Sequence, residues 1–173
     1  MTITKLAFAC GVIALTSSAV LAACPSESLV LGAGKAFASA SRSGSASAFI
    51  SASSRFADTR SIALSALGPH RKKLSKAQES EYVRLAQNFM GKFMSEYAAK
   101  FNTAGLKITS CSGSIVNATA NGGRKVVFRV GGGRLQDVNV ASVWLAGQMR
   151  SQFVGVLNRN NGDISALMEY LRG

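Results

Sequence analysis

The sequence predicts an α+β fold in which helices cover one face of a small antiparallel sheet. Apolar residues recur at spacings of three and four before residue 102 and again after residue 142, as they do along the buried face of a helix. Between these segments, residues 106–140 form short runs of strand character separated by glycine-rich turns. The length of 173 residues allows one domain.

The first 23 residues are typical of a secretory signal. Residues 1–5 carry one positive charge, and residues 6–23 form an uncharged, mostly apolar stretch that ends in small side chains. Polar residues 16–18 interrupt this stretch, whereas a membrane-spanning helix needs about 20 strongly apolar residues. We therefore expect a periplasmic protein whose mature chain starts at Cys24.

Cys24 and Cys111 are the two cysteines that remain after removal of this signal. The run from Leu21 to Cys24 resembles a bacterial lipobox, in which Cys24 would become a lipidated first residue of an anchored lipoprotein. An oxidising periplasm also allows a disulfide between the two cysteines, or two free thiols. The sequence leaves these three fates open.

The start of the mature chain offers few large apolar residues. Residues 24–34 are rich in small side chains and are predicted to be a flexible lead-in. Residues 35–52 contain enough alanine for a helix, but Gly44 and many serines weaken it. Residues 55–67 then fit a helix that ends at Gly68 and Pro69, because proline cannot continue a helix.

The strongest helical pattern begins at Ser75, three residues before Gln78, in a capping-box arrangement. Burial of seven large side chains on its stripe, at roughly 1.5 to 3 kcal/mol each, is worth more than about 10 kcal/mol before entropy. This helix must therefore dock on another apolar surface. The stripe consists of Tyr82, Leu85, Ala86, Phe89, Met90, Phe93, Met94, Tyr97 and Phe101.

A sheet of about four strands is predicted next, with tight turns at the glycines of residues 121–123 and 131–133. In the last two strands, one face is apolar and the other wetter, so we expect the apolar face to pack toward the long helix. The predicted strands are residues 106–111, 114–120, 125–130 and 135–140.

Two helices are predicted to close the chain. An apolar stripe runs from Val143 to about Asn158 and has helical spacing. The turn at residues 160–163 follows, and Asp163 is placed to cap a last helix over residues 164–171.

The chain carries 20 basic and 8 acidic residues, a formal charge of +12, which becomes +11 once residues 1–23 are removed. Such an excess favours an anionic partner, either nucleic acid or a membrane surface. Export excludes cytosolic nucleic acid, so we expect membrane headgroups or an acidic envelope protein to be the partner. The candidate contact residues are Arg71, Lys72, Lys73 and Lys76, for which the alternative is a solvated basic face.

The motifs of common enzymes and metal sites are missing from the sequence. It has no Gly-x-Ser-x-Gly elbow, no phosphate-binding loop and no His-Glu-x-x-His. His70 is the only histidine, and Asp58 and Asp137 are expected to cap turns or to pair with arginines rather than to transfer protons. We therefore expect a protein that is not an enzyme and that holds neither a metal nor a cofactor.

Five blocks stand in order over residues 55–172, namely Phe56–Gly68, Leu74–Tyr82, Arg134–Val140, Arg150–Phe153 and Gly162–Leu167. Together they resemble the MlaC family of periplasmic phospholipid carriers, also called the toluene-tolerance auxiliary family. The chain departs from the family pattern in two places. The tryptophan that the family carries in the hairpin before the last strand is missing near Gly133, and Trp144 appears in the following helix instead. The helical N-terminal part is also short, which implies a smaller or differently shaped cavity.

This resemblance implies a nuclear-transport-factor-like, cone-shaped fold, in which a curved sheet is wrapped by helices and acyl chains lie between them. It implies one lipid-binding domain over residues 35–173, working as a monomer with membrane-bound components of an ABC-type lipid transport system. The alternative is an envelope adaptor with a filled core and no lipid; a hydrolase of this fold would show a polar pocket with Asp or His. The residues expected to contact lipid, or else to pack as ordinary core, are Phe89, Phe93, Tyr97, Val126, Phe128, Val138, Val140 and Trp144.

Overall fold

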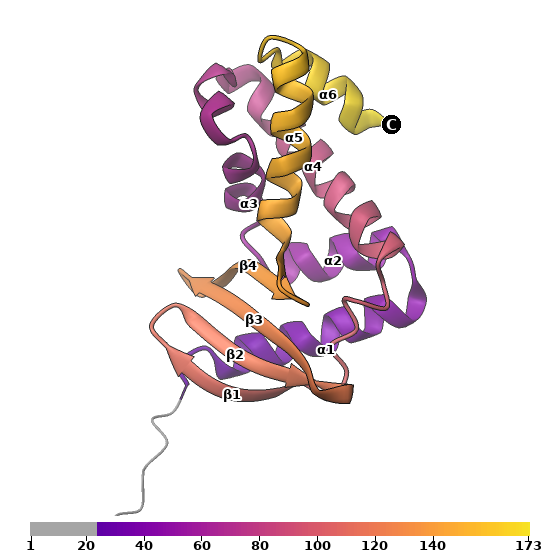
Figure 1. Cartoon of the computed structure of the whole chain (residues 1–173), viewed down its shortest axis with the longest axis vertical. Coiled ribbons are helices and arrows are strands. Elements are labelled where there is room, and N and C mark those ends of the chain that lie inside the picture. The colour runs from indigo at the N-terminus through magenta and orange to yellow at the C-terminus, as the bar shows by residue number, and fades with distance from the viewer. Residues whose placement is uncertain (1–23) are drawn as a thin grey trace, which may run out of the picture.

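A computed structural model describes residues 24–173, so the predicted signal over residues 1–23 lies outside the described part of the chain (Figure 1). Helices come first and last, and the sheet lies between them. The helical elements are α1 (Glu27–Ser43), α2 (Ala46–Phe56), α3 (Thr59–Ala66), the 3-10 helix η1 (Gly68–Lys73), α4 (Lys76–Glu96), α5 (Leu145–Arg159) and α6 (Ile164–Arg172).

The sheet is an antiparallel meander whose strands follow one another in chain order. Gly132 and Gly133 both have positive φ, which closes the β3–β4 hairpin as the glycine-rich turn predicts. Beyond the four expected strands there is a two-residue fifth strand, because Ala141 and Ser142 turn the chain back with positive φ. The strands are β1 (Lys107–Ser112), β2 (Ile115–Ala120), β3 (Arg124–Gly131), β4 (Arg134–Val140) and β5 (Val143–Trp144), with the 3-10 turn η2 (Asn121–Gly123) after β2.

The flexible lead-in predicted for residues 24–34 is wrong, because α1 begins at Glu27 and buries Val30 and Ala33 completely. The buried face of α1 is made largely of small residues, which a count of large apolar side chains overlooks. Gly34 contacts the Leu106 side chain so closely that an added Cβ would overlap it. Small residues therefore let the backbone of α1 approach the chain that leads into β1.

The helix expected over residues 55–67 is divided in the structure. Phe56 ends α2, and α3 starts only at Thr59. Asp58 separates the two helices, and its side chain accepts a hydrogen bond from the Ser61 amide at 2.9 Å, which is the capping role expected for it. The capping box of Ser75 and Gln78 at the start of α4 is present as predicted.

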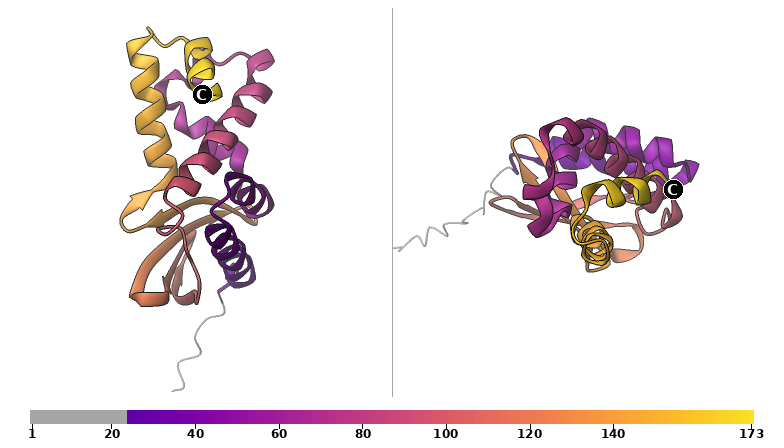
Figure 2. Two further views of the ribbon diagram at one scale, coloured as in Figure 1. Left: turned by 90° about the vertical axis from the view of Figure 1, so that its right-hand side faces the viewer. Right: turned by 90° about the horizontal axis from the view of Figure 1, so that it is seen from above.

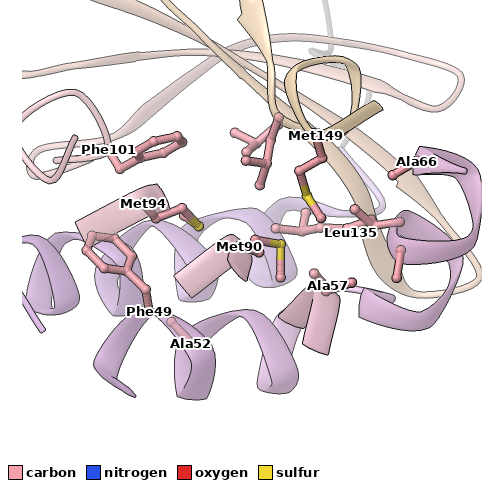
Figure 3. Close-up of a cluster of buried hydrophobic side chains, with 14 of the residues drawn as sticks. Phe49, Ala52, Ala57, Ala66, Met90, Met94, Phe101, Leu135 and Met149 are labelled. Atoms are coloured by element: carbon pink, nitrogen blue, oxygen red, sulfur yellow. The ribbon is translucent and has the colours of Figure 1, made fainter. Parts of the chain in front are cut away.

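α4 packs chiefly against α2, α3 and α6, while α1 lies along the sheet (Figures 1 and 2). Figure 3 shows the buried cluster where these layers meet, with Phe49 from α2, Met90 and Met94 from α4, Leu135 from β4 and Met149 from α5. The apolar residues of β3 and β4 thus complete a core that several helices share. The α+β class predicted from the sequence is confirmed, and the two C-terminal helices are present.

α5 leaves the sheet at β5 and runs to the far end of the molecule, where α6 contacts both α5 and α4 (Figure 2). α4 ends at Glu96, so Tyr97 and Phe101 of the predicted stripe lie in the turn after it rather than in the helix. Phe101 is nevertheless buried. Near the sheet, α4 is therefore followed by a turn, and α5 is preceded by β5.

Cys24 and Cys111 form a disulfide with their Cα atoms 5.7 Å apart. The bond joins the residue that precedes α1 to the edge strand β1. It selects one of the three fates that the sequence leaves open for Cys24. A sulfur held in a disulfide is not free for the thioether bond of a lipid anchor.

Candidate functional site

Two adjoining pockets lie along the C-terminal half of α4 and share Phe93 and Tyr97; together we call them the α4–α5 groove. Their volumes are about 220 and 300 Å³. The first is lined by Phe93, Tyr97, Lys100, Phe101, Val140, Ala141, Val143, Leu145 and Gln148. The second is lined by Phe89, Lys92, Phe93, Glu96, Tyr97, Gln152, Tyr170, Leu171 and Gly173.

Aromatic side chains from α4 and from the turn after it line the groove. The Phe89 ring lies 5.1 Å from Phe153 of α5 and 6.3 Å from Tyr170 of α6. Farther along α4, the Phe93 ring lies 4.9 Å from Tyr97 and 6.3 Å from Phe101. These distances are typical of packed aromatic pairs, so the groove has a well-defined apolar wall.

Exposed apolar surface is concentrated at this groove. In the described part of the chain, the large hydrophobic side chains that are exposed are Tyr97, Val143 and Tyr170, at 42%, 50% and 45%. Each of them lines one or both of the two pockets. A contiguous apolar patch with a polar rim is a mark of a binding surface rather than of ordinary packing.

Four of the eight residues expected to contact lipid line the groove: Phe93, Tyr97 and Val140 line the first pocket, and Phe89 the second. The structure thus brings the aromatic stripe of α4 together with the end of β4. Whether these side chains contact lipid stays a prediction.

The other four candidates lie elsewhere. Val126 and Phe128 are fully buried, and Val138 lines a separate internal cavity of about 10 Å³. Trp144 pairs with Asn139 on the sheet, and its ring lies 4.7 Å from the Arg129 guanidinium, so it lines neither pocket. In the two-residue strand β5, side chains alternate between faces, and Val143 takes the position on the groove side.

Sequence reasoning missed Lys100, Val143, Leu145 and Tyr170 as groove residues. The sequence pattern assigned Val143, Leu145 and Tyr170 only to the apolar stripes of helices. It placed Lys100 outside the stripe of the long helix. Their common location depends on how β5, α5 and α6 return to α4, which no local pattern encodes.

The predicted contact residues Arg71, Lys72 and Lys73 lie in η1, and Lys76 begins α4, so this basic cluster is at the opposite end of α4 from Tyr97. All four are exposed. Lys73 donates from Nζ to the Asn161 carbonyl at 2.8 Å, which ties the cluster to the α5–α6 turn. The basic cluster and the groove are therefore separate surfaces.

The candidate proton-transfer groups have structural partners. Asp137 is buried, and its Oδ1 accepts hydrogen bonds from the amides of Val138 at 2.9 Å and Ala146 at 3.0 Å, the second of which lies in the first turn of α5. Burial raises the pKa of Asp137, and these two hydrogen bonds oppose that rise. His70 hydrogen-bonds through Nε2 to Asn158 Oδ1 at 3.0 Å. Asp137 therefore serves to cap α5.

Neither a metal site nor a membrane-spanning helix is found in residues 24–173. Within this range, no three His, Cys, Asp or Glu side chains gather as a metal site would require. None of the helices in the same range combines the length and apolarity needed to cross a bilayer.

Comparison with known proteins decides the family. The family model described as MlaC protein matches residues 33–173. The chain belongs to the MlaC protein family. This match confirms the resemblance that the sequence blocks indicated, and no curated protein matches the chain.

A solved structure shares the fold of this MlaC-family chain. It is a phospholipid-binding protein from Ralstonia solanacearum in complex with a phospholipid, and it superposes with a TM-score of 0.68. The two chains are 14% identical, and the match covers 84% of this chain and 92% of the other. At this level of identity the likeness shows the fold alone. The arrangement of sheet and helices in this chain is therefore also found in that solved structure.

Proposed function

We propose that this MlaC-family chain is a periplasmic carrier that binds the acyl chains of a phospholipid in the α4–α5 groove and shuttles the lipid between membrane-bound components of an ABC-type transport system. The observation that carries the proposal is the gathering of Tyr97, Val143 and Tyr170, the exposed large hydrophobic residues of the described chain, around one aromatic groove. The phospholipid bound to the protein of the same fold supports it.

The energetics of lipid transfer require an enclosed apolar site. Moving two acyl chains with about 30 methylenes into water costs on the order of 24 kcal/mol, at about 0.8 kcal/mol for each methylene. A soluble carrier must therefore cover both chains almost completely, while the headgroup stays in water. The first pocket has an apolar part suited to the chains and a polar part suited to the headgroup. Its inner residues Phe101, Val140 and Leu145 are apolar and buried, whereas Lys100 and Gln148 are polar.

The groove must widen to hold two chains, since pockets for ligands of drug size already occupy about 300–1,000 Å³. Leu145 lines both the first pocket and the internal cavity that Met90 and Val138 also line. Rotation of the Leu145 side chain would join the two spaces and extend the groove toward the sheet. The buried Met90 beside it is unbranched and flexible, which suits a core that repacks around different occupants.

The two other classes of function fit the site less well. An adaptor without a lipid ligand would fill its core and expose no aromatic groove. A hydrolase would need an acid or base in a polar pocket, whereas Asp137 is engaged by two backbone amides and His70 lies outside both pockets of the groove. A binding and carrying role is therefore the best match to the chemistry of the groove.

Export to the periplasm is part of the proposal. It is supported by the signal-like residues 1–23 and by the Cys24–Cys111 disulfide, which forms in oxidising compartments. The intact mass of the protein from a periplasmic extract should be that of residues 24–173 less two hydrogens. A mass increased by a diacylglyceryl group would instead show a lipoprotein.

Native mass spectrometry tests the lipid ligand directly. Protein purified from cells should carry phospholipid, and delipidated protein should take it up again. Phe93→Glu, in the wall shared by both pockets, should abolish uptake because it places a charge against the acyl chains. Phe56→Glu is the matched control, because Phe56 is also half-buried but lines neither pocket. Wild-type protein that takes up no phospholipid would refute the carrier role.

A further inference from the structure

The first pocket of the α4–α5 groove contains one charged side chain, that of Lys100, and no carboxylate. The second pocket differs, because there Lys92 is accompanied by Glu96. The ion pairs within residues 24–173 are Arg60–Glu79 and Arg172–Glu81, so Lys100 belongs to neither. An uncompensated ammonium group thus lies beside an apolar pocket.

The backbone that carries Lys100 is held firmly by residues from other elements. Arg124, the first residue of β3, donates from Nη1 to the carbonyls of Ala99 at 2.9 Å, Lys100 at 3.3 Å and Asn102 at 2.9 Å. Three carbonyl acceptors on one guanidinium fix the turn after α4, and the Ser41 hydroxyl adds a bond of 2.7 Å to the Ala98 carbonyl from α1. Lys100 therefore projects from a turn with a defined position.

The side chain of Lys100 is directed toward the groove by an aromatic contact. Its Nζ lies over the ring of Tyr97, 5.0 Å from the ring centroid. At this distance the electron-rich face of the ring attracts the ammonium group. Because Tyr97 lines both pockets, this contact holds a positive charge at the place where the groove meets solvent.

We infer that Lys100 binds the phosphate group of the lipid cargo, so that the carrier distinguishes phospholipids from uncharged lipids with the same acyl chains. This inference rests on the proposed function. When acyl chains lie against Phe101, Val140 and Leu145, the glycerol backbone reaches the opening of the pocket and its phosphate comes within reach of the ammonium group. Lysine offers three donors and a full positive charge to such an anion.

The experiment compares a phosphatidylglycerol with the diacylglycerol that has identical acyl chains and lacks the phosphoglycerol headgroup. Each is supplied to delipidated protein in the same neutral detergent, and binding is measured by native mass spectrometry and by titration. Lys100→Gln should weaken phosphatidylglycerol binding about three- to tenfold, the range between an exposed ion pair and a charge-assisted hydrogen bond, and leave diacylglycerol binding unchanged. Lys125→Gln, an exposed lysine outside both pockets, should change neither.

The outcomes separate this inference from the proposed function. If wild-type protein binds neither lipid, the carrier role itself is refuted. If it binds phosphatidylglycerol but Lys100→Gln leaves the preference over diacylglycerol intact, or Lys125→Gln lowers it equally, the role of Lys100 is refuted. Inorganic phosphate in excess should not displace the lipid; displacement would show a site for a free anion rather than for a lipid headgroup.

Discussion

At the scale of single residues, Gly91 decides how closely α4 can approach α2. A Cβ on Gly91 would lie 2.9 Å from the Ala46 carbonyl oxygen and would overlap the side chain of Ile50. The backbone oxygen cannot move without shifting the start of α2. Because α4 carries Phe93 and leads directly into Tyr97, this close contact also sets the position of these two groove residues.

Gly91→Ala should therefore lower the free energy of unfolding by about 1–3 kcal/mol through overpacking. Gly155→Ala is the matched control, since Gly155 is also within a helix but an added Cβ there meets only the Arg159 side chain at 3.7 Å. The control should be neutral or should stabilise α5 by up to about 1 kcal/mol, as alanine favours helix. Urea denaturation measures both variants, and equal stabilities would contradict the close-contact argument.

At the scale of elements, the disulfide attaches the beginning of α1 to the strand at the edge of the sheet. The bonded residues are 87 positions apart, so the bond closes a long loop that spans α1, α2, α3, α4 and the start of the sheet. Cross-linking across so long a segment restricts the unfolded chain strongly. It also keeps the small-residue face of α1 against the chain near Leu106.

Replacing both cysteines, as in C24S/C111S, should lower the free energy of unfolding by about 4.6 kcal/mol, the loop-entropy value for this separation. Reduced wild-type protein should unfold at the same urea concentration as the double variant. Thiol titration of the unfolded wild-type protein should find no free cysteine before reduction. Free thiols in the mature protein would exclude the bond.

At the scale of the whole molecule, the basic cluster and the groove lie at opposite ends of α4. Arg71, Lys72, Lys73 and Lys76 are exposed and belong to a mature chain with a formal charge of +11. An anionic membrane attracts each nearby cation by about 1 kcal/mol. We therefore predict that the basic cluster guides docking, as a surface separate from the groove proposed to hold the lipid.

Reversing the charge of these four residues to glutamate should slow the delivery of lipid to anionic acceptor vesicles, and the difference from wild type should shrink at high salt. The amount of bound lipid should not change. Reversal of Lys107 and Lys125, which are exposed on the sheet, provides the control. Loss of bound lipid in the cluster variant would assign these residues to the binding site instead of to docking.

The sequence by itself determined the features that depend on neighbours along the chain. The capping box at Ser75 and Gln78, the cap at Asp163 and the glycine turn of the β3–β4 hairpin follow from local hydrogen bonding and backbone freedom. The stripe of α4 and the alternation in β3 follow from the periods of helix and strand. These regularities were enough for the α+β class and for the family resemblance.

Only the tertiary structure decided which apolar residues remain open to solvent. Phe128 and Phe93 both belong to regular apolar patterns, yet Phe128 is fully buried and Phe93 lines the groove. The first part of α1, up to Gly34, escaped prediction because its packing depends on small side chains that allow close backbone approach. Lys100 became a candidate only in the folded chain. Arg124, which is distant in sequence, holds its backbone, and the Tyr97 ring holds its ammonium group beside the groove. The burial of a side chain and the charges around it depend on residues that are far apart in the chain, so local periodicity cannot predict them.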